Sequence, residues 1–385
     1  MIEITKKSEC CGCHGCSNIC PNQCIDMSVD NEGFWYPKVN KDLCIDCNLC
    51  KKVCPVIQNI DKKEFNVLAY ACKNKNEKIR LRSSSGGIFT NLCEYVINNN
   101  GIVFGAAFNN KFEVEHMESS DLEGCEKFRG SKYVQSKILN SYSKVKQYLD
   151  EGRIVLFTGT QCQIKGLNLY LRKKYTNLIL VDFICHGVPS PLIFELYKQE
   201  LMHEYNSNIE QIGFREKNKG WKEFSYATKF KNGEIYLKTL NEDVYMKGFL
   251  TDLYLRPSCY ECKSKNFTSG SDITLADYWG IQNKHPEFDD DKGVSLILIN
   301  SENGEKIVNN ISNNIEKIET DLDYAISCNP SAIRPVKYNT NRDDFFRELE
   351  TSNLNELIEK YTRISILKRV TRKVKSILSK IKKID

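Results

Sequence analysis

Two runs of cysteine near the N-terminus have the spacing needed to bind iron–sulfur clusters. The first run is Cys10-x2-Cys13-x2-Cys16-x3-Cys20, the second is Cys44-x2-Cys47-x2-Cys50-x3-Cys54, and a proline follows each run. Three thiolates on one short loop can hold one face of an iron–sulfur cube. The fourth cysteine of each run lies too far along the chain to close on its own loop, so we expect it to ligate the other cluster.

This spacing resembles that of bacterial ferredoxins and predicts two clusters with crossed ligands. One 4Fe-4S cluster is predicted on Cys10, Cys13, Cys16 and Cys54. The second is predicted on Cys20, Cys44, Cys47 and Cys50. A zinc or disulfide module is the alternative. However, zinc sites use two separated cysteine pairs rather than triplets. The start of the chain carries no signal-peptide pattern and no apolar run reaches transmembrane length, so we expect a reducing, cytoplasmic location without disulfides.

Four later cysteines offer a third set of ligands. Cys162 and Cys185 each follow directly after an apolar, β-rich run, and Cys259 and Cys262 form a Cys-x2-Cys pair. In open α/β sheets the chemistry gathers just beyond the carboxyl ends of the strands. Four thiolates are also the number that a third 4Fe-4S cluster needs. The alternatives are that Cys162 and Cys185 are buried small side chains and that the pair is half of a zinc site.

A serine- and glycine-rich loop could bind a phosphate-bearing cofactor. Residues 82–87 read RSSSGG and lead into a segment with helical periodicity. Hydroxyls and glycines before a helix offer backbone N–H groups to an anion. The alternative is an ordinary capping loop, in which serine caps the helix and glycine turns the chain. Lys132 lies in a second loop-like segment and could meet a phosphate or a flavin ring.

The order of predicted elements indicates an α+β protein. A small ferredoxin-like two-cluster domain is followed by an α/β domain with a mixed sheet, because strand-length apolar runs alternate with helical segments. Alternating residues in 212–240, broken by turn-forming segments, indicate antiparallel hairpins. Further strands are expected at 33–39, 67–72, 102–108, 153–158, 178–184 and 294–300, and a helix at 88–99.

We divide the chain into four regions on this basis. Residues 1–62 form the two-cluster domain, 65–148 the first part of the α/β domain, 150–330 its second part with the flavin and third cluster site, and 331–385 a helical basic tail.

Charge is distributed unevenly along the 385 residues. The chain has 55 Lys and Arg against 50 Asp and Glu, a net charge of +5, yet residues 361–385 hold nine basic residues and one acid. The tail therefore carries +8 and the remaining body 5 − 8 = −3. A slightly acidic body argues against nucleic-acid binding.

Apolar and basic residues of 361–385 alternate with helical spacing. This pattern predicts either peripheral contact with the anionic inner face of a membrane or a helix that docks on its own protein or a partner subunit.

Five segments, taken in order, resemble one known family. They are Ser83-Ser-Ser-Gly-Gly-Ile-Phe89, Gly130-Ser-Lys-Tyr-Val-Gln135, Phe157-Thr-Gly-Thr-Gln-Cys162, Cys185-His-Gly-Val-Pro189, and Cys259-x2-Cys262 followed by Ala276-Asp277. Together they resemble the beta subunit of coenzyme F420 hydrogenases and dehydrogenases, in the form with an N-terminal two-cluster ferredoxin. Gln161 stands where that family often has proline.

The resemblance implies an iron–sulfur flavoprotein oxidoreductase. Its FAD site would include Ser85, Gly86, Gly87 and Lys132, and its third cluster would use Cys162, Cys185, Cys259 and Cys262. A flavin can split a two-electron transfer into single electrons that clusters accept. The partners would be a redox protein or subunit and an unidentified small-molecule acceptor, with a possible role beside cell-surface polysaccharide synthesis. Two alternatives remain: a flavin-free electron-carrying subunit, and a reductase of a nucleotide-sugar or glycan precursor. No catalytic residue is predicted.

Overall fold

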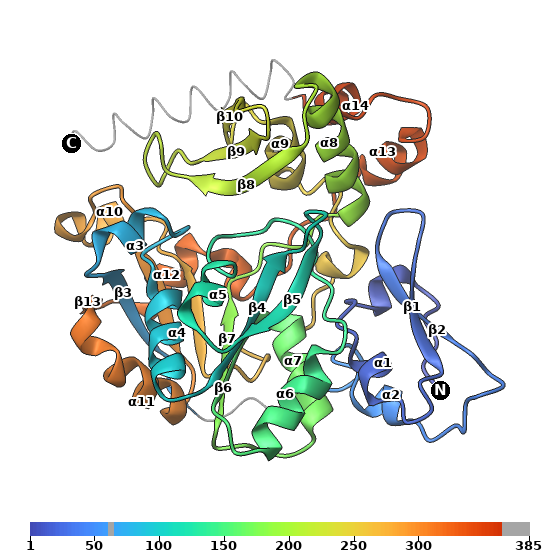
Figure 1. The fold of residues 1–385 in the computed structure, drawn as a ribbon, viewed down its shortest axis with the longest axis horizontal. Helices are drawn as coiled ribbons and strands as arrows, with labels where there is room; N and C mark the ends of the chain where they lie inside the picture. The colour runs from blue at the N-terminus through green and yellow to red at the C-terminus, as the bar shows by residue number, and fades with distance from the viewer. Residues whose placement is uncertain (61–64, 364–385) are drawn as a thin grey trace.

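A large mixed sheet forms the centre of the molecule, which the computed structural model describes for residues 1–60 and 65–363 (Figure 1). Its strand order is β13-β3-β12-β11-β7-β6-β4-β5. Strands β4, β6, β7 and β11 run parallel to one another, whereas β5 and β12 are antiparallel to their neighbours. The strands are β3 Leu68–Asn74, β4 Ile102–Phe108, β5 Val114–Ser119, β6 Val155–Thr160, β7 Leu178–Phe183, β11 Ile273–Asp277, β12 Ser295–Ile299 and β13 Ile315–Glu319.

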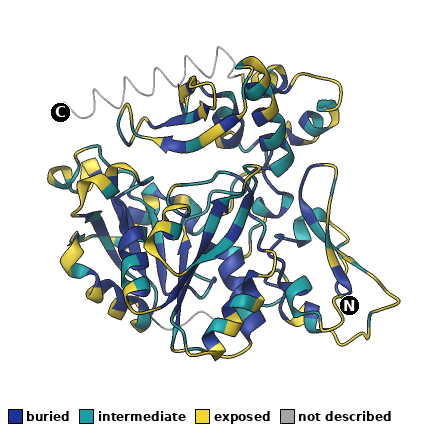
Figure 2. Ribbon diagram, viewed as in Figure 1, coloured by how far each residue is buried: buried dark blue, intermediate teal, exposed yellow. Residues whose placement is uncertain are grey.

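Helices cover both faces of this sheet, which explains the nearly continuous apolar runs of its central strands. Ile102 and Phe104 of β4 belong to the core cluster that includes Leu167, whereas Val103 belongs to the cluster that includes Leu92 on the opposite face. The strands are accordingly buried along most of their length (Figure 2). The helices of this α/β part are α3 Glu77–Leu81, α4 Ile88–Asn98, α5 Leu122–Glu126, α6 Ser141–Asp150, α7 Gln161–Leu171, α10 Ile281–Lys284, α11 Glu302–Asn310 and α12 Leu322–Cys328.

A second, antiparallel sheet lies over one end of the large one (Figure 1). Its order is β10-β9-β8, and an aromatic core joins it to the neighbouring helices. The elements are β8 Ile209–Glu216, β9 Ser225–Phe230, β10 Ile235–Thr239, α8 Pro191–Glu204, α9 Val244–Leu250, α13 Arg342–Glu348 and α14 Leu354–Thr362.

The N-terminal cysteine module is a small unit beside the large sheet (Figure 1). It consists of α1 Gly15–Ile19, the antiparallel hairpin of β1 Ile25–Val29 and β2 Trp35–Val39, and α2 Leu49–Lys52. Helix α1 packs against α7, which directly follows β6. A buried ion pair between Glu32 and Arg342, with Nη2 2.6 Å from Oε2, fastens the module to the rest of the chain.

The mixed α/β sheet and the hairpins predicted from the sequence are confirmed. The expected strands 67–72, 153–158 and 178–184 differ from the observed ones by one or two residues at an end, and β4 matches the expected 102–108. The sequence pattern missed the edge strands β1, β5 and β13, which carry many polar residues. It also missed β11, a central strand of only five residues, Ile273–Asp277. Of the basic tail, residues 364–385 lie outside the described part. No helix of the described residues is long and apolar enough to span a bilayer.

Candidate metal centres

The eight cysteines of the N-terminal module line two separate cavities. One cavity is lined by Cys10, Cys13, Cys16 and Cys54 together with neighbouring apolar residues. The other is lined by Cys20, Cys44, Cys47 and Cys50. The structure thus brings together the two crossed sets that the spacing predicts, with the fourth thiol of each set taken from the other run.

The backbone of both cysteine loops explains how three thiols come to face one space. Gly12 and His14 in the first loop have φ of +67° and +58°, and the equivalent Asp46 and Asn48 in the second have +54° and +58°. Left-handed backbone is uncommon for residues with a side chain. Its recurrence at the same positions of both loops turns the chain tightly around each cavity, and α1 and α2 begin directly afterwards.

The thiols surround these cavities rather than meeting at a point. Within residues 1–60 and 65–363, no three His, Cys, Asp or Glu side chains converge as ligands of a single metal ion. A zinc site needs four ligands directed at one atom. A cube with four separate irons needs thiols spaced around a larger volume, so the residues present fit an iron–sulfur cluster better than zinc. The ligand assignment itself remains a prediction.

Cys24 is an additional thiol that the spacing did not single out. Its Sγ lies 3.3 Å from that of Cys20, it is buried, and it lines the same cavity. The cavity of the second set is therefore lined by five thiols, one more than a 4Fe-4S cluster needs.

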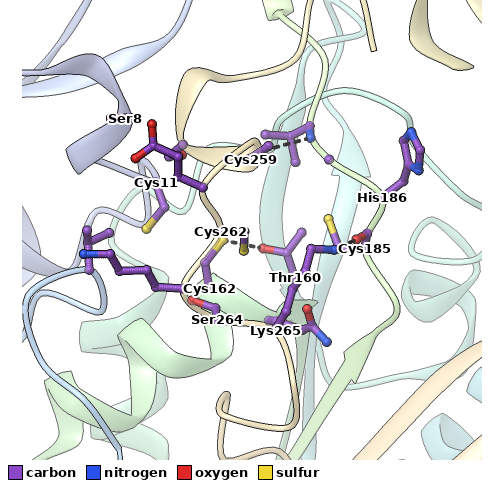
Figure 3. A pocket seen from close by; sticks show the side chains of 17 residues that line it. Ser8, Cys11, Thr160, Cys162, Cys185, His186, Cys259, Cys262, Ser264 and Lys265 are labelled. Atoms are coloured by element: carbon purple, nitrogen blue, oxygen red, sulfur yellow. Dashed lines mark hydrogen bonds between the residues drawn. The ribbon is translucent and has the colours of Figure 1, made fainter. Parts of the chain in front are cut away.

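The third predicted set also lines a single cavity (Figure 3). Cys162, Cys185, Cys259 and Cys262 all border it, together with Cys11 from the first cysteine loop. Cys162 lies in the first turn of α7, directly after β6. Cys185 comes two residues after β7 ends, at the same edge of the sheet. Parallel strands deliver their carboxyl ends to one edge, which is why two cysteines so far apart in sequence meet.

Hydrogen bonds and burial define the electrostatics of this cavity. The Val188 N–H donates to the Cys259 Sγ at 3.4 Å, and the Thr160 hydroxyl lies 3.1 Å from the Cys162 Sγ. Burial raises the pKa of Cys259 to about 12 and raises the pKa of Cys185 well above its usual range. These thiols are therefore neutral at pH 7 unless a bound cation stabilises the thiolates.

Cys11 connects the first and third thiol sets. It lines both cavities, and its thiol lies next to those of Cys13 and Cys162. Cys11 fits neither ligand spacing, so the sequence gives no reason to select it. Only the packing of α7 against the first loop places it between the two sets.

Three buried cations also surround these thiols. Arg256 has no exposed surface, Lys165 is 1% exposed and Lys265 is 5% exposed. The pKa of the Lys165 ammonium is lowered by burial and raised by the thiols of Cys11, Cys262 and Cys54, so these sulfurs lie near it. No carboxylate of the described residues forms an ion pair with any of the three cations.

The residues predicted for FAD are placed in one region, but most of their polar groups are occupied. The Lys132 ammonium donates to the carbonyl oxygens of residues 127–129. The Ser85 hydroxyl donates to Val294 O and the Gly86 N–H to Ser295 Oγ. Gly87 has φ of +84° and begins α4 without a side-chain cap. The first amides of α4 have no protein acceptor within the described residues.

Arg215 joins these loops and was missed by sequence reasoning. Its guanidinium donates to Asp277, to the Tyr133 hydroxyl and to Ser84 O. Its Nε is buried without a hydrogen-bond partner. The predicted segments 83–87, 130–135 and 276–277 therefore meet around one buried cation that lies far from all of them in sequence.

Comparisons with known proteins agree with this arrangement. Residues 152–323 match the family model for the C terminus of the coenzyme F420 hydrogenase/dehydrogenase beta subunit. The F subunit of the F(420)H(2) dehydrogenase of Methanosarcina mazei is 22% identical over 275 residues, which are 68% of this chain and 73% of that protein. An uncharacterised polyferredoxin-like protein of Methanocaldococcus jannaschii is 38% identical over 55 residues, 12% of this chain and 33% of that protein.

Among solved structures, a chain of the F420-reducing [NiFe] hydrogenase complex of Methanosarcina barkeri matches with 17% identity and a TM-score of 0.47. The match covers 74% of this chain and 93% of that chain. Residues 152–323 are thus similar to the C-terminal part of coenzyme F420 hydrogenase/dehydrogenase beta subunits, and 68% of the chain is similar to the F subunit of the Methanosarcina mazei dehydrogenase.

Proposed function

We propose that this chain is an iron–sulfur flavoprotein that passes single electrons between a redox partner and FAD, which exchanges two electrons with a small-molecule acceptor. The observation that carries the proposal is the third cavity, where thiols from separate strand ends meet directly beside Cys11 of the N-terminal module. A chain with only the N-terminal clusters would need no such cavity. Iron–sulfur chemistry is the function that four partly buried thiols around one cavity at a sheet edge best support.

The three thiol sets lie along a path that suits stepwise electron transfer. Cys47, at the second set, is exposed, so a partner protein would meet the module at this end. The first set follows, and Cys11 links it to the third. In this proposal the protein's own residues hold the centres in order and exclude water, while potentials are set by burial and hydrogen bonds to sulfur.

The FAD site is the second part of the proposal. It rests on the family resemblance, on the uncapped start of α4 and on the unpartnered Nε of Arg215. Because Ser85, Gly86 and Lys132 already have protein partners, a phosphate would meet the amides that follow Gly87. The same occupied groups favour the second candidate, a flavin-free electron-carrying subunit of a larger complex. Coenzyme F420 is one acceptor to assay, given the names of the relatives.

Anaerobic purification with iron, sulfide and flavin analysis tests the proposal. We expect about twelve irons per chain, four for each set. The double variant Cys259→Ala/Cys262→Ala should lose about four, and Cys13→Ser about four from the module. Cys328→Ala is the matched control, because this cysteine lines none of the three thiol cavities. A wild-type chain with one zinc, or with no more than eight irons after reconstitution, contradicts the third site.

Flavin content separates the two candidates. We expect FAD in the wild-type protein and in the Cys259→Ala/Cys262→Ala variant. A protein with full iron content that takes up no FAD on reconstitution is the flavin-free carrier. Gly86→Asp is a poor probe, because a Cβ at residue 86 would lie 2.4 Å from Cys72 O and disturb the sheet. Deleting residues 1–62 is equally poor, because Ser8, Cys11 and Val56 form part of the third cavity.

Membrane contact through residues 361–385 also remains a proposal. The chain with and without these residues should differ in co-sedimentation with anionic vesicles, by an attraction of about 1 kcal/mol for each basic residue near the surface. Equal binding by both forms would contradict it.

A further inference from the structure

The first and third thiol sets share a buried positive charge on Arg256. Its side chain is fully buried, and its guanidinium donates only to neutral groups: Cys10 O at 2.7 Å, Trp35 O at 2.8 Å and the Gln135 amide oxygen at 3.0 Å. No carboxylate of the described residues pairs with it. A buried charge without a counter-charge costs several kcal/mol, so the native state should supply an anion nearby.

Arg256 is attached to the ligand loops of both sets. A Cβ built on Gly12 would lie 2.8 Å from its Nη1, so the guanidinium rests directly on the first cysteine loop. On the other side, the Arg256 carbonyl accepts from the Cys259 N–H at 2.9 Å, and its own N–H donates to Val188 O. Val188 in turn donates to the Cys259 sulfur.

Lys165 places a second charge between the same two sets. It extends from α7, one turn after Cys162, and is 1% exposed. The next residue of α7, Gly166, lies against the first set, because a Cβ built on it would lie 3.1 Å from the Cys13 Sγ. The thiols of Cys54 and Cys262 raise the pKa of the Lys165 ammonium, against the lowering by burial. Its ammonium makes no hydrogen bond or ion pair with the described residues. A side chain placed this way contributes charge but no specific contact.

We propose that Arg256 and Lys165 are shared counter-charges of the first and third iron–sulfur clusters and hold the reduction potentials of both above that of the second cluster. A 4Fe-4S cluster on four thiolates is an anion and becomes more negative when reduced. Nearby buried cations therefore stabilise the reduced form. Electrons that enter at the exposed second cluster would be drawn inward to the pair of clusters on either side of Cys11. This inference rests on the proposed function.

The second cluster provides the internal reference for a test. Arg256 hydrogen-bonds to the backbone of Cys10 and of Cys259, whereas within the described residues neither Arg256 nor Lys165 hydrogen-bonds to a residue that lines the cavity of Cys20, Cys44, Cys47 and Cys50. An EPR-monitored redox titration of the full chain should therefore show two potentials that respond to these cations and one that does not. The Cys259→Ala/Cys262→Ala chain identifies the signal of the third cluster.

Lys165→Met is the sharpest variant, because it removes a charge without removing a hydrogen bond. We expect the reduced-to-oxidised ratio of the first and third clusters to fall about tenfold at fixed potential, a shift of about 59 mV for a one-electron couple. Arg256→Gln should shift the same two clusters in the same direction. Lys165→Arg and Arg256→Lys keep the charge and should restore potentials close to wild type.

The matched control is Glu32→Gln/Arg342→Gln. This pair is buried at the same interface, and Arg342 donates to Leu255 O, next to Arg256. The double variant loosens the interface but leaves the net charge unchanged, so it should not shift the potentials. A purely structural role for Arg256 would make the control and Arg256→Gln behave alike.

The outcomes separate the inference from the proposed function. A wild-type chain without iron overturns the proposed function. If the Lys165→Met chain binds its full complement of iron and none of its reduction potentials changes, the shared counter-charge is refuted and the proposed function is not. If Arg256→Gln fails to load clusters, the Lys165 variants and Arg256→Lys still decide the question.

Discussion

Breaking the ion pair between Glu32 and Arg342 should release the N-terminal module from the α/β core. The Arg342 side chain is 3% exposed and that of Glu32 is 11% exposed, and the guanidinium forms two hydrogen bonds to the carboxylate. Glu32→Gln removes the negative charge but keeps the shape. The guanidinium is then left buried with only the exposed carboxylate of Asp343 nearby, at 3.9 Å, so the cost approaches the ~3–5 kcal/mol of an unpaired buried charge. Lys7 also approaches Glu32, but its side chain is 41% exposed and adds little.

Hydrogen exchange is the suitable assay, since cluster loss would make global unfolding irreversible. Peptides that cover β1 and β2 report the local opening of the module. At about 1.4 kcal/mol for each factor of ten, the expected cost accelerates their exchange roughly a hundred- to several-thousandfold. Peptides from β6 and β7 should be unaffected, because the large sheet does not depend on the pair.

Two further variants make the reasoning refutable. Glu3→Gln makes the same change of charge on an exposed residue of the module and should leave exchange unchanged. Glu32→Gln/Arg342→Met removes both charges and should recover much of the lost protection, because two buried uncharged side chains cost less than one unpaired charge. If Glu32→Gln exchanges like wild type, or if the double variant is no better than the single one, the pair does not hold the module in place.

Three other perturbations have defined outcomes. Cys20→Ala should retain part of the second cluster because Cys24 lies 3.3 Å away, whereas Cys20→Ala/Cys24→Ala should lose about four irons by iron analysis. Gly166→Ala would place a Cβ 3.1 Å from the Cys13 Sγ, so chelators should remove iron from the first cluster faster than from the second, despite the better helix propensity of alanine. Burial raises the pKa of Asp182 from 3.8 to about 6. The folded state therefore binds more protons than the unfolded state between these values, so stability should fall as pH rises from about 4 to about 6 and be flat above. Asp182→Asn should abolish that slope in melting temperatures, and an unchanged slope would contradict the assignment.

The crossed cysteine sets can be predicted from the sequence because the spacing within each run is local. Three ligands of each set lie within seven residues, and the fourth is the last cysteine of the other run, Cys54 or Cys20, so the repeated spacing is enough to group them. The central strands are equally readable, since burial on both faces leaves an apolar run such as that of β4. Strand β13 reads IEKIE, which suits a helix or a loop as well as an edge strand. Its pairing with β3 is decided by the sheet, not by its own residues.

Buried charges are the features that sequence patterns hide. Arg215 and Asp277 are 62 positions apart, and nothing in the sequence around either residue indicates that they pair beneath the 83–87 loop. Lys165 and Arg256 resemble surface cations in sequence, because Lys and Arg are mostly exposed. Lys165 is buried because α7 packs against the first cysteine loop. Arg256 is buried because the loop before Cys259 packs there too.

The placement of these cations gives the third thiol set a physical reason to be anionic. Four neutral thiols alone would be an ordinary buried cluster of small side chains. No carboxylate of the described residues forms an ion pair with Arg256, Lys165 or Lys265, although Glu261 lines the same cavity. Under the proposed function, a bound cation would expel the protons from the thiols, and a centre that is negative overall would balance these side chains. A thiolate-ligated iron–sulfur cluster would meet both conditions, whereas a dry cluster of thiols would meet neither. A four-cysteine zinc site would also be anionic, so the iron and zinc content of the purified chain decides between the two.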